Sequence, residues 1–398
     1  MDIFRNAKLQ HTTAQRRTGD AASTVISPDD FAHACDEISQ WEGYAATPLV
    51  PQPGLAQRID VGQIYYKDEG PRFGLGSFKA LGGSYAALRI LQRELTAKLG
   101  RDVSAEDIRN GVYAKDVSEI TLVSATDGNH GRSLAWGCQR FGAPCRIYIH
   151  AEVSEGRAQA MRDLGADVVR IKGDYDESVL LAKSEATEHG WFVVSDTSWP
   201  GYSEPPRDVM AGYGMMTREI CQTLPQAPTH VFLQGGVGGL AASVAAGLRQ
   251  HYAEASPQVV IVEPDLAACL FDSARNGKAT NFAIKEETIM AGLSCGEPSG
   301  MAWEILAEEA SDFLTIPDTI IPPVIRMLAR RECNDPMIEA GESAVAGLAA
   351  VIAASLEPAL REKLNLDQNA RILLIGSEGV TDPAIFNEIM SETAQGSL

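Results

Sequence analysis

The stretch HVFLQGGVGGLAASVAAGL, residues 230–248, joins a short apolar run to a glycine-rich turn and then to an alanine-rich segment. An apolar run of this length, bounded by turn residues, predicts a buried strand. The glycines allow the backbone to turn sharply where the helical pattern begins. A strand, a tight glycine turn and a helix in this order are typical of parallel α/β folds.

Six further β-branched runs alternate with segments whose apolar residues recur at helical spacing, which predicts an α/β protein built on open parallel sheets. The six runs are TLVSA, CRIYIH, DVVRI, WFVVS, VVIVE and RILLIG. Ligands of such sheets bind at the carboxyl ends of the strands. Chemistry is therefore expected in four loops, TDGNHG, SDTSWPGY, QGGVGG and GSEGVTDP.

Length, charge and composition limit the kinds of protein that this chain can be. A chain of 398 residues has room for two domains, and its net charge of -19 argues against nucleic-acid binding. No run approaches the roughly 20 apolar residues of a membrane span, and no apolar stretch follows the basic residues near the N-terminus, so we expect a soluble protein that is not exported. None of the seven cysteines forms a CxxC pair. His150-Ala151-Glu152 matches the start of a zinc-deaminase motif, but no P-C-x-x-C follows, so no metal is expected.

The glycine loop after HVFL has two functional interpretations besides a purely structural turn. Its free amides and the helix N-terminus behind them can hold a phosphate group. Residues 236–241 also fit the dinucleotide pattern G-x-G-x-x-A, and Glu263 ends the following strand where a ribose-binding acid is expected. By itself the loop favours an NAD-binding oxidoreductase.

A second stretch, FGLGSFKALGG at residues 73–83, places Lys79 among Phe78, Ala80 and Leu81. A lysine in such surroundings often extends its ammonium along an apolar wall to water. The dinucleotide interpretation leaves Lys79 unexplained. A phosphate-bearing cofactor that condenses with a lysine amine explains both stretches, and pyridoxal phosphate is such a cofactor.

From about Gly74 to Asp382 the motifs GSFKALGG, TDGNHG, QGGVGG and GSEGVTD follow one another in the order of a known family. The chain resembles the fold-type-II pyridoxal-phosphate enzymes, the group of tryptophan synthase β and threonine deaminase, and within it the diaminopropionate ammonia-lyases. The resemblance implies two open-sheet α/β domains with the cofactor in the cleft between them. It places the large domain at residues 1–86 and 206–398 and the small one at 87–205, and it implies a homodimer. A cytoplasmic location is expected from the lack of export and membrane signals.

The resemblance also implies roles for particular residues. Lys79 matches the lysine that bonds to the cofactor aldehyde, and Asn129 matches the partner of the ring hydroxyl. Ser377 stands where the group places a hydroxyl or thiol facing the pyridine nitrogen, and Thr381 is close enough in sequence to compete. The residues that match the phosphate loop are Gly235, Gly236, Val237, Gly238 and Gly239.

One position in the asparagine loop separates this chain from hydroxyamino-acid deaminases, which usually read S-x-G-N-H-G there. Here Asp127 stands two residues before the asparagine, and a carboxylate there suits a substrate with a side-chain amine. Asp196 matches a second acidic residue of the ammonia-lyases. Loop capping for Asp127 and helix capping for Asp196 are the structural alternatives. Trp199 and Tyr202 either line the substrate site or belong to the core.

The predicted activity is pyridoxal-phosphate-dependent elimination of ammonia from 2,3-diaminopropionate, giving pyruvate and ammonia. Lys79 is expected to remove the Cα proton of the L-isomer, and Asp127 to act on the D-isomer or on the leaving amine. The alternatives are a serine or threonine ammonia-lyase of the same fold, and an NAD-binding oxidoreductase. The resemblance further suggests a disulfide between Cys269 and Cys295, although free thiols are the default in a reducing cytoplasm.

Overall fold

The computed structural model describes residues 1–14, 18–126 and 128–391, which form two compact units. The first unit comprises Met1–Pro28, Ala45–Ser77 and the chain from Met216 on, and the second comprises Asp29–Tyr44 and Phe78–Met215. None of the helices in these residues is long and apolar enough to span a membrane.

The first unit is built on a seven-stranded sheet with the order β1-β10-β9-β8-β11-β3-β2. Its five central strands are parallel, and the edge strands β1 and β2 run antiparallel to their neighbours. The strands are β1 (Gln10–Thr13), β2 (Leu49–Pro51), β3 (Gln63–Asp68), β8 (His230–Gln234), β9 (Gln258–Pro264), β10 (Ala310–Ile316) and β11 (Arg371–Gly376).

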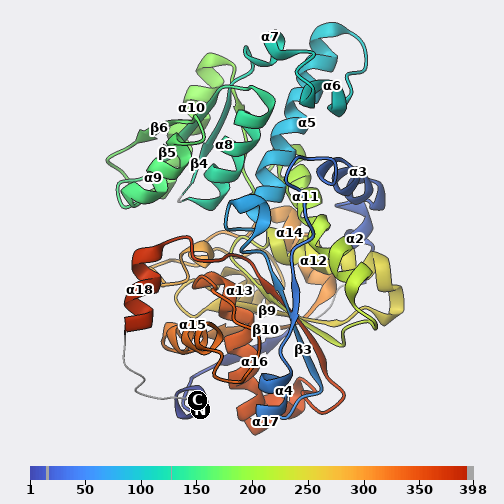
Figure 1. Ribbon diagram of the computed structural model, residues 1–398, viewed down its shortest axis with the longest axis vertical. Helices are drawn as coiled ribbons and strands as arrows, with labels where there is room; N and C mark the ends of the chain where they lie inside the picture. The colour runs from blue at the N-terminus through green and yellow to red at the C-terminus, as the bar shows by residue number, and fades with distance from the viewer. Residues whose placement is uncertain (15–17, 127, 392–398) are drawn as a thin grey trace. The chain divides into compact units, whose positions relative to one another are not determined.

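Helices cover this sheet, and the core lies where they meet it (Figure 1). The alanine-rich α16 is buried along nearly its whole length because it contacts β8, β9, β10 and β11 at once. The helices of this unit are α1 (Asp2–Arg5), α2 (Ala21–Thr24), α4 (Pro53–Arg58), α12 (Gly239–Tyr252), α13 (Cys269–Asn276), α14 (Gly300–Glu309), α15 (Ile321–Arg330), α16 (Ala346–Leu356), α17 (Pro358–Lys363) and α18 (Pro383–Ser391), with the short 3-10 helices η1 (Arg72–Gly74), η2 (Ala253–Ala255), η3 (Ala291–Leu293), η4 (Asp318–Ile320) and η5 (Ser343–Val345).

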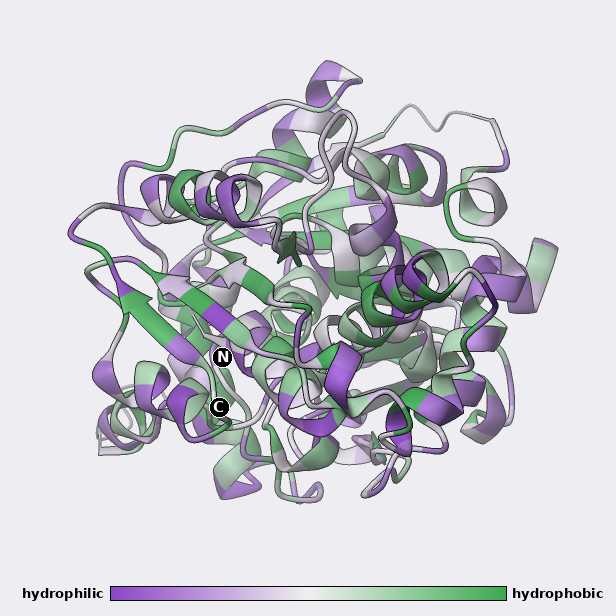
Figure 2. Ribbon diagram, turned by 90° about the horizontal axis from the view of Figure 1, so that it is seen from above, coloured by the Kyte–Doolittle hydropathy of each residue, from purple (hydrophilic) through white to green (hydrophobic). Residues whose placement is uncertain are grey.

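The second unit holds a four-stranded parallel sheet with the order β6-β5-β4-β7. Helices α8 and α10 both pack on β4 and β5, and Figure 2 shows the strands largely in the hydrophobic colour. The strands are β4 (Leu122–Ala125), β5 (Cys145–Ile149), β6 (Asp167–Arg170) and β7 (Phe192–Val193). The helices are α3 (Pro28–Ile38), α5 (Lys79–Leu99), α6 (Ala105–Arg109), α7 (Ala114–Val117), α8 (Asn129–Phe141), α9 (Glu155–Arg162), α10 (Tyr175–His189) and α11 (Glu204–Thr223), the last of which continues into the first unit.

All seven strands predicted from the sequence are present, and the α/β prediction is confirmed. The run WFVVS gives only the two-residue strand β7, because the chain leaves the sheet after Val193 to form the loop that carries Asp196. Four strands, β1, β2, β3 and β10, were not predicted. Two of them are short edge strands, which carry little hydrophobic signal.

Candidate active site

Lys79 is the first residue of α5 and follows the buried Phe78. The ring of Phe78 packs against Tyr213 with 4.6 Å between centroids, and Leu81, two residues after Lys79, is fully buried. The Lys79 side chain itself retains 22% of its exposure. Apolar packing of its neighbours therefore fixes the backbone of Lys79, while its ammonium remains accessible to a ligand.

Glycines allow α5 to lie close to its neighbours in the second unit. A Cβ on Gly82 would come within 2.4 Å of the Tyr213 ring, and one on Gly83 within 2.6 Å of the Ser133 hydroxyl. Ser84 then donates its hydroxyl to the Ser133 carbonyl at 2.7 Å, which ties α5 to α8. Gly83 thus allows the close approach of α5 to α8, and Gly82 allows that of α5 to α11.

The Lys79 ammonium donates a hydrogen bond to the Asp196 carboxylate at 2.6 Å, across 117 residues of sequence. Burial by itself would raise the pKa of Asp196. The charges of Lys79 and His130 and the hydrogen bond from Lys79 outweigh it, so the pKa lies below its usual range. Asp196 is therefore an ionised carboxylate beside the lysine, and it follows β7 outside any helix.

Asn129 begins α8 directly after β4 and is half-buried. The Thr126 hydroxyl accepts hydrogen bonds from the amides of Gly128 and Gly131, on either side of Asn129. Asp127 lies outside the described residues. His130 was not singled out from the sequence, although it stands in the same motif; its Nε2 lies 3.0 Å from the carbonyl of Val194, two residues before Asp196.

In the first unit, the glycine loop 235–239 connects β8 to the N-terminus of α12. Gly236 and Gly238 have φ angles of +66° and +95°, a conformation that favours glycine. The amides of Gly236, Val237 and Gly239 donate to no acceptor in the part of the chain that the structure describes. Unsatisfied amides at the start of a helix are suited to an anion, so this loop fits the phosphate of pyridoxal phosphate.

Replacing Gly236 with alanine is expected to weaken cofactor binding about tenfold, because a side chain at this φ strains the cradle by roughly 1–2 kcal/mol. Gly277 is a matched control, since it has a φ of +65° at the end of α13 and a Cβ there would contact nothing within 4 Å. Gly277→Ala should lower stability similarly and leave cofactor affinity unchanged. If a cofactor titration gave equal affinities for the two variants, the assignment of the loop as the phosphate site would be wrong.

Glu263 lies beneath the glycine loop, at the end of β9. A Cβ on Gly235 would come within 2.4 Å of its Cγ. Its carboxylate accepts the amides of Leu270 and Phe271 at 3.1 and 2.7 Å, at the start of α13, and it is fully buried. The sequence-based interpretation of Glu263 as a ribose ligand is therefore wrong, because its oxygens are committed to the α13 N-terminus and inaccessible to a dinucleotide.

Burial raises the pKa of Glu263 to about 8, against the opposing effect of the two amides. A folded-state pKa above the unfolded value means that the folded protein binds this proton more tightly, so its stabilisation is lost as pH rises through 8. Relative to Glu263→Gln, the wild type should lose roughly 2 to 3 kcal/mol of unfolding free energy between pH 6 and pH 9. Urea unfolding at each pH measures this change in free energy. The control is Glu304→Gln, because Glu304 is exposed on α14, and its unfolding free energy relative to wild type should stay the same between pH 6 and pH 9. A pH-independent difference for Glu263→Gln would contradict the raised pKa.

Ser377 follows β11 immediately and is buried. The side-chain amide of Gln234, the last residue of β8, lies 3.5 Å from its hydroxyl and donates to the Ile375 carbonyl at 2.6 Å. Gln234 also precedes the glycine loop, so Ser377 stands next to the start of that loop. Thr381 lies four residues further on and is half-buried. This position favours Ser377 over Thr381 as the ring-nitrogen partner, and the assignment stays a prediction.

Among the described residues, Cys269 and Cys295 are both reduced, so the suggested disulfide is not formed in this structure. The Cys269 thiol instead donates to the Gly236 carbonyl at 3.4 Å. Burial raises the pKa of Cys269 well above its ordinary value, which keeps it a thiol.

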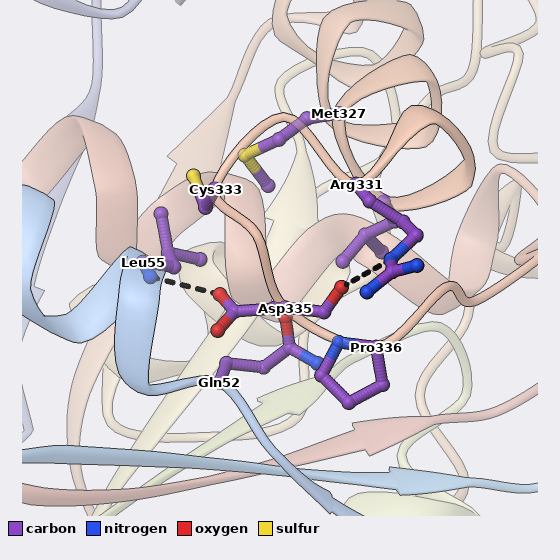
Figure 3. Close-up of a pocket in the computed structure, with 8 residues that line it drawn as sticks. Gln52, Leu55, Met327, Arg331, Cys333, Asp335 and Pro336 are labelled. Carbon is purple, nitrogen blue, oxygen red and sulfur yellow. Dashed lines mark hydrogen bonds between the residues drawn. The ribbon is translucent and has the colours of Figure 1, made fainter.

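A small cavity in the first unit lies apart from these residues (Figure 3). Asp335 points toward it and accepts the amides of Gly54 and Leu55 at the start of α4. The cavity has a volume of about 10 Å³ and holds roughly one water molecule, so it is too small for an amino acid. None of the predicted site residues lines it.

Residues 40–378 match the family model described as pyridoxal-phosphate dependent enzyme. The chain belongs to this family. The diaminopropionate ammonia-lyase of Escherichia coli K12 is 38% identical over 356 residues, 88% of each protein, and that of Salmonella typhimurium is 33% identical over 394 residues, covering 96% of this chain and 97% of the relative. Within the pyridoxal-phosphate enzymes the chain is therefore a member of the diaminopropionate ammonia-lyases.

A crystal structure of the Escherichia coli diaminopropionate ammonia-lyase, in complex with an aminoacrylate-PLP azomethine reaction intermediate, superimposes with a TM-score of 0.88 at 34% identity and covers 97% of both chains. Tomato threonine deaminase, at 20% identity and a TM-score of 0.72, shares the fold. The fold-type-II prediction and the pyridoxal-phosphate prediction are confirmed, and the NAD alternative is excluded.

Proposed function

We propose that this enzyme eliminates ammonia from 2,3-diaminopropionate and releases pyruvate and a second ammonia. The observation that carries the proposal is the contact between the Lys79 ammonium and the ionised Asp196 carboxylate, in a chain whose relatives are diaminopropionate ammonia-lyases. A lysine beside a fixed carboxylate is suited to move a proton at Cα, and a carboxylate is suited to a substrate that carries a second amine.

The residues that would hold pyridoxal phosphate are Lys79 at its aldehyde, Asn129 at its ring hydroxyl, the glycine loop 235–239 at its phosphate and Ser377 at its ring nitrogen. When bound, the cofactor withdraws electrons from Cα of the amino acid. A neutral hydroxyl at the ring nitrogen leaves that nitrogen unprotonated, which favours elimination.

Lys79 Nζ is the proposed base for the Cα proton of the L-isomer. Taking that proton turns the amine into an ammonium, and the Asp196 oxygen at 2.6 Å stabilises the charge in the place where it forms. Asp127 is the proposed group for the D-isomer or for protonating the departing β-amine. The two carboxylates would then explain a preference for a diamine over serine.

A homodimer, by likeness to the family, and a cytoplasmic location are part of the proposal. The boundaries of the two domains near residues 87 and 205 stay a prediction.

The test compares pyruvate release from both enantiomers of 2,3-diaminopropionate with release from serine and threonine. Diaminopropionate should be strongly preferred, and Asp196→Asn should lose about 10- to 100-fold in kcat/KM for it. Asp127→Asn should lose chiefly the D-isomer or both isomers, according to whether Asp127 is a base or an acid. A preference for serine or threonine would favour the hydroxyamino-acid alternative.

A further inference from the structure

The loop that carries Asp196 closes with a tight turn, Trp199 to Tyr202, just before α11. The two residues exchange backbone hydrogen bonds at 3.2 and 2.9 Å, and Gly201 at the third position has a φ of +84°. Pro200 followed by glycine is the pairing that a type II turn prefers. The turn brings Tyr202 back over the residues that precede Asp196.

The two aromatic rings of this turn stack on each other. The centroids of Trp199 and Tyr202 are 3.9 Å apart with 8° between the planes, and the Lys183 ammonium from α10 lies 3.6 Å above the Trp199 ring. Stacking and the cation–π contact hold the Tyr202 ring from one side. The ring therefore has a defined position from which its hydroxyl can act.

The Tyr202 hydroxyl bridges two backbone groups. It donates to the Val193 carbonyl at 2.9 Å and accepts the Ser195 amide at 3.0 Å. These two groups flank Val194, and the Val194 carbonyl lies 3.0 Å from His130 Nε2. Burial raises the pKa of Tyr202 well above its ordinary value, so the hydroxyl keeps its proton for the Val193 carbonyl. The backbone is thus held at three successive residues before Asp196.

We propose that Tyr202 is a positioning residue that holds the Asp196 carboxylate at Lys79 through its bridge between Val193 and Ser195. The sequence suggested only a substrate wall or core packing for this tyrosine. The inference rests on the proposed role of Asp196, because Tyr202 acts through that carboxylate. A displacement of about 1 Å in a reacting group costs on the order of a hundredfold in rate, so removal of the bridge should be visible in turnover.

The test uses Tyr202→Phe in the holoenzyme, which keeps the stacked ring and removes only the hydroxyl. We expect about a tenfold or larger loss of kcat for diaminopropionate with little change in KM. The double variant Tyr202→Phe with Asp196→Asn should be no slower than Asp196→Asn alone, because both act through one carboxylate. Tyr65→Phe is the control, since the Tyr65 hydroxyl contacts only Gln63, at 3.5 Å, among the described residues; it should behave as wild type.

Hydrogen exchange of the Ser195 amide provides a readout that does not depend on turnover. The amide should be protected in the wild type and exchange at least about tenfold faster in Tyr202→Phe, while the thermal midpoint changes little. Wild-type exchange of the Ser195 amide at the rate of an unprotected loop overturns the proposal, even if the variant does not fold. Normal turnover of Tyr202→Phe also overturns it, as does a multiplicative loss in the double variant. If instead the role proposed for Asp196 is wrong, the Asp196→Asn variant will itself keep full activity.

Discussion

Replacing Lys79 with alanine is expected to reduce pyruvate release by at least about a thousandfold and to abolish the stable yellow colour of the bound cofactor. Lys79 is the proposed bond to the cofactor aldehyde and the proposed base at Cα, so one substitution removes both roles. It also leaves the Asp196 carboxylate without the ammonium at 2.6 Å that lowers its pKa. Steady-state assays with both enantiomers and a visible spectrum of the purified protein measure the two losses.

Lys98 is the matched control because it lies in the last turn of the same helix, α5. Its ammonium forms exposed ion pairs with Asp116 and Glu119, which contribute little to stability. Lys98→Ala should retain colour and activity. A yellow, active Lys79→Ala protein would contradict the assignment of Lys79.

The largest expected effect on stability lies in a buried charge cluster of the first unit. Arg72 donates to Glu69 at 2.8 Å and to both oxygens of Glu219, each at 2.8 Å, and Lys67 donates to Glu219 as well. Two cations face two carboxylates, and all four side chains are almost fully excluded from water. The cluster joins the segment after β3, which leads toward Lys79, to the end of α11.

Arg72→Met should lower the free energy of unfolding by about 3–5 kcal/mol, because two buried carboxylates lose their main partner while the side-chain volume stays similar. Urea unfolding at neutral pH measures the change. Arg275→Met is the control, since Arg275 has the same three-residue spacing from its acid, Asp272. Arg275 is exposed, Asp272 is half-buried and the two are 3.9 Å apart. The effect of Arg275→Met should stay within about 0.5 kcal/mol. Equal effects of the two variants would contradict the dependence on burial.

The sequence predicted the parallel sheets well, because runs such as VVIVE and RILLIG are apolar enough to be buried on both faces. It did not predict β3 or β10. In both strands polar residues interrupt the apolar ones, such as Lys67 in β3 and Asp312 in β10. Their place in the sheet also depends on strands that are far away in the chain.

The sequence marks the proposed site residues but not the contacts among them. Lys79 and the glycine loop are marked by local motifs, whereas the contact of Lys79 with Asp196 spans 117 residues and follows from the fold of the second unit. Glu263 fitted the dinucleotide alternative because spacing alone cannot distinguish a ribose ligand from a buried helix cap. The bridge from Tyr202 depends on hydroxyl geometry, which no sequence pattern records.

The most direct test of the central claim is the ratio of ammonia to pyruvate released from 2,3-diaminopropionate by the holoenzyme. Elimination of the β-amine followed by hydrolysis of the released product consumes one water and gives two ammonia for each pyruvate. We predict a ratio of two from diaminopropionate, at a kcat/KM well above that for serine, which can give only one. No pyruvate from diaminopropionate, or a higher kcat/KM for serine, would contradict the account.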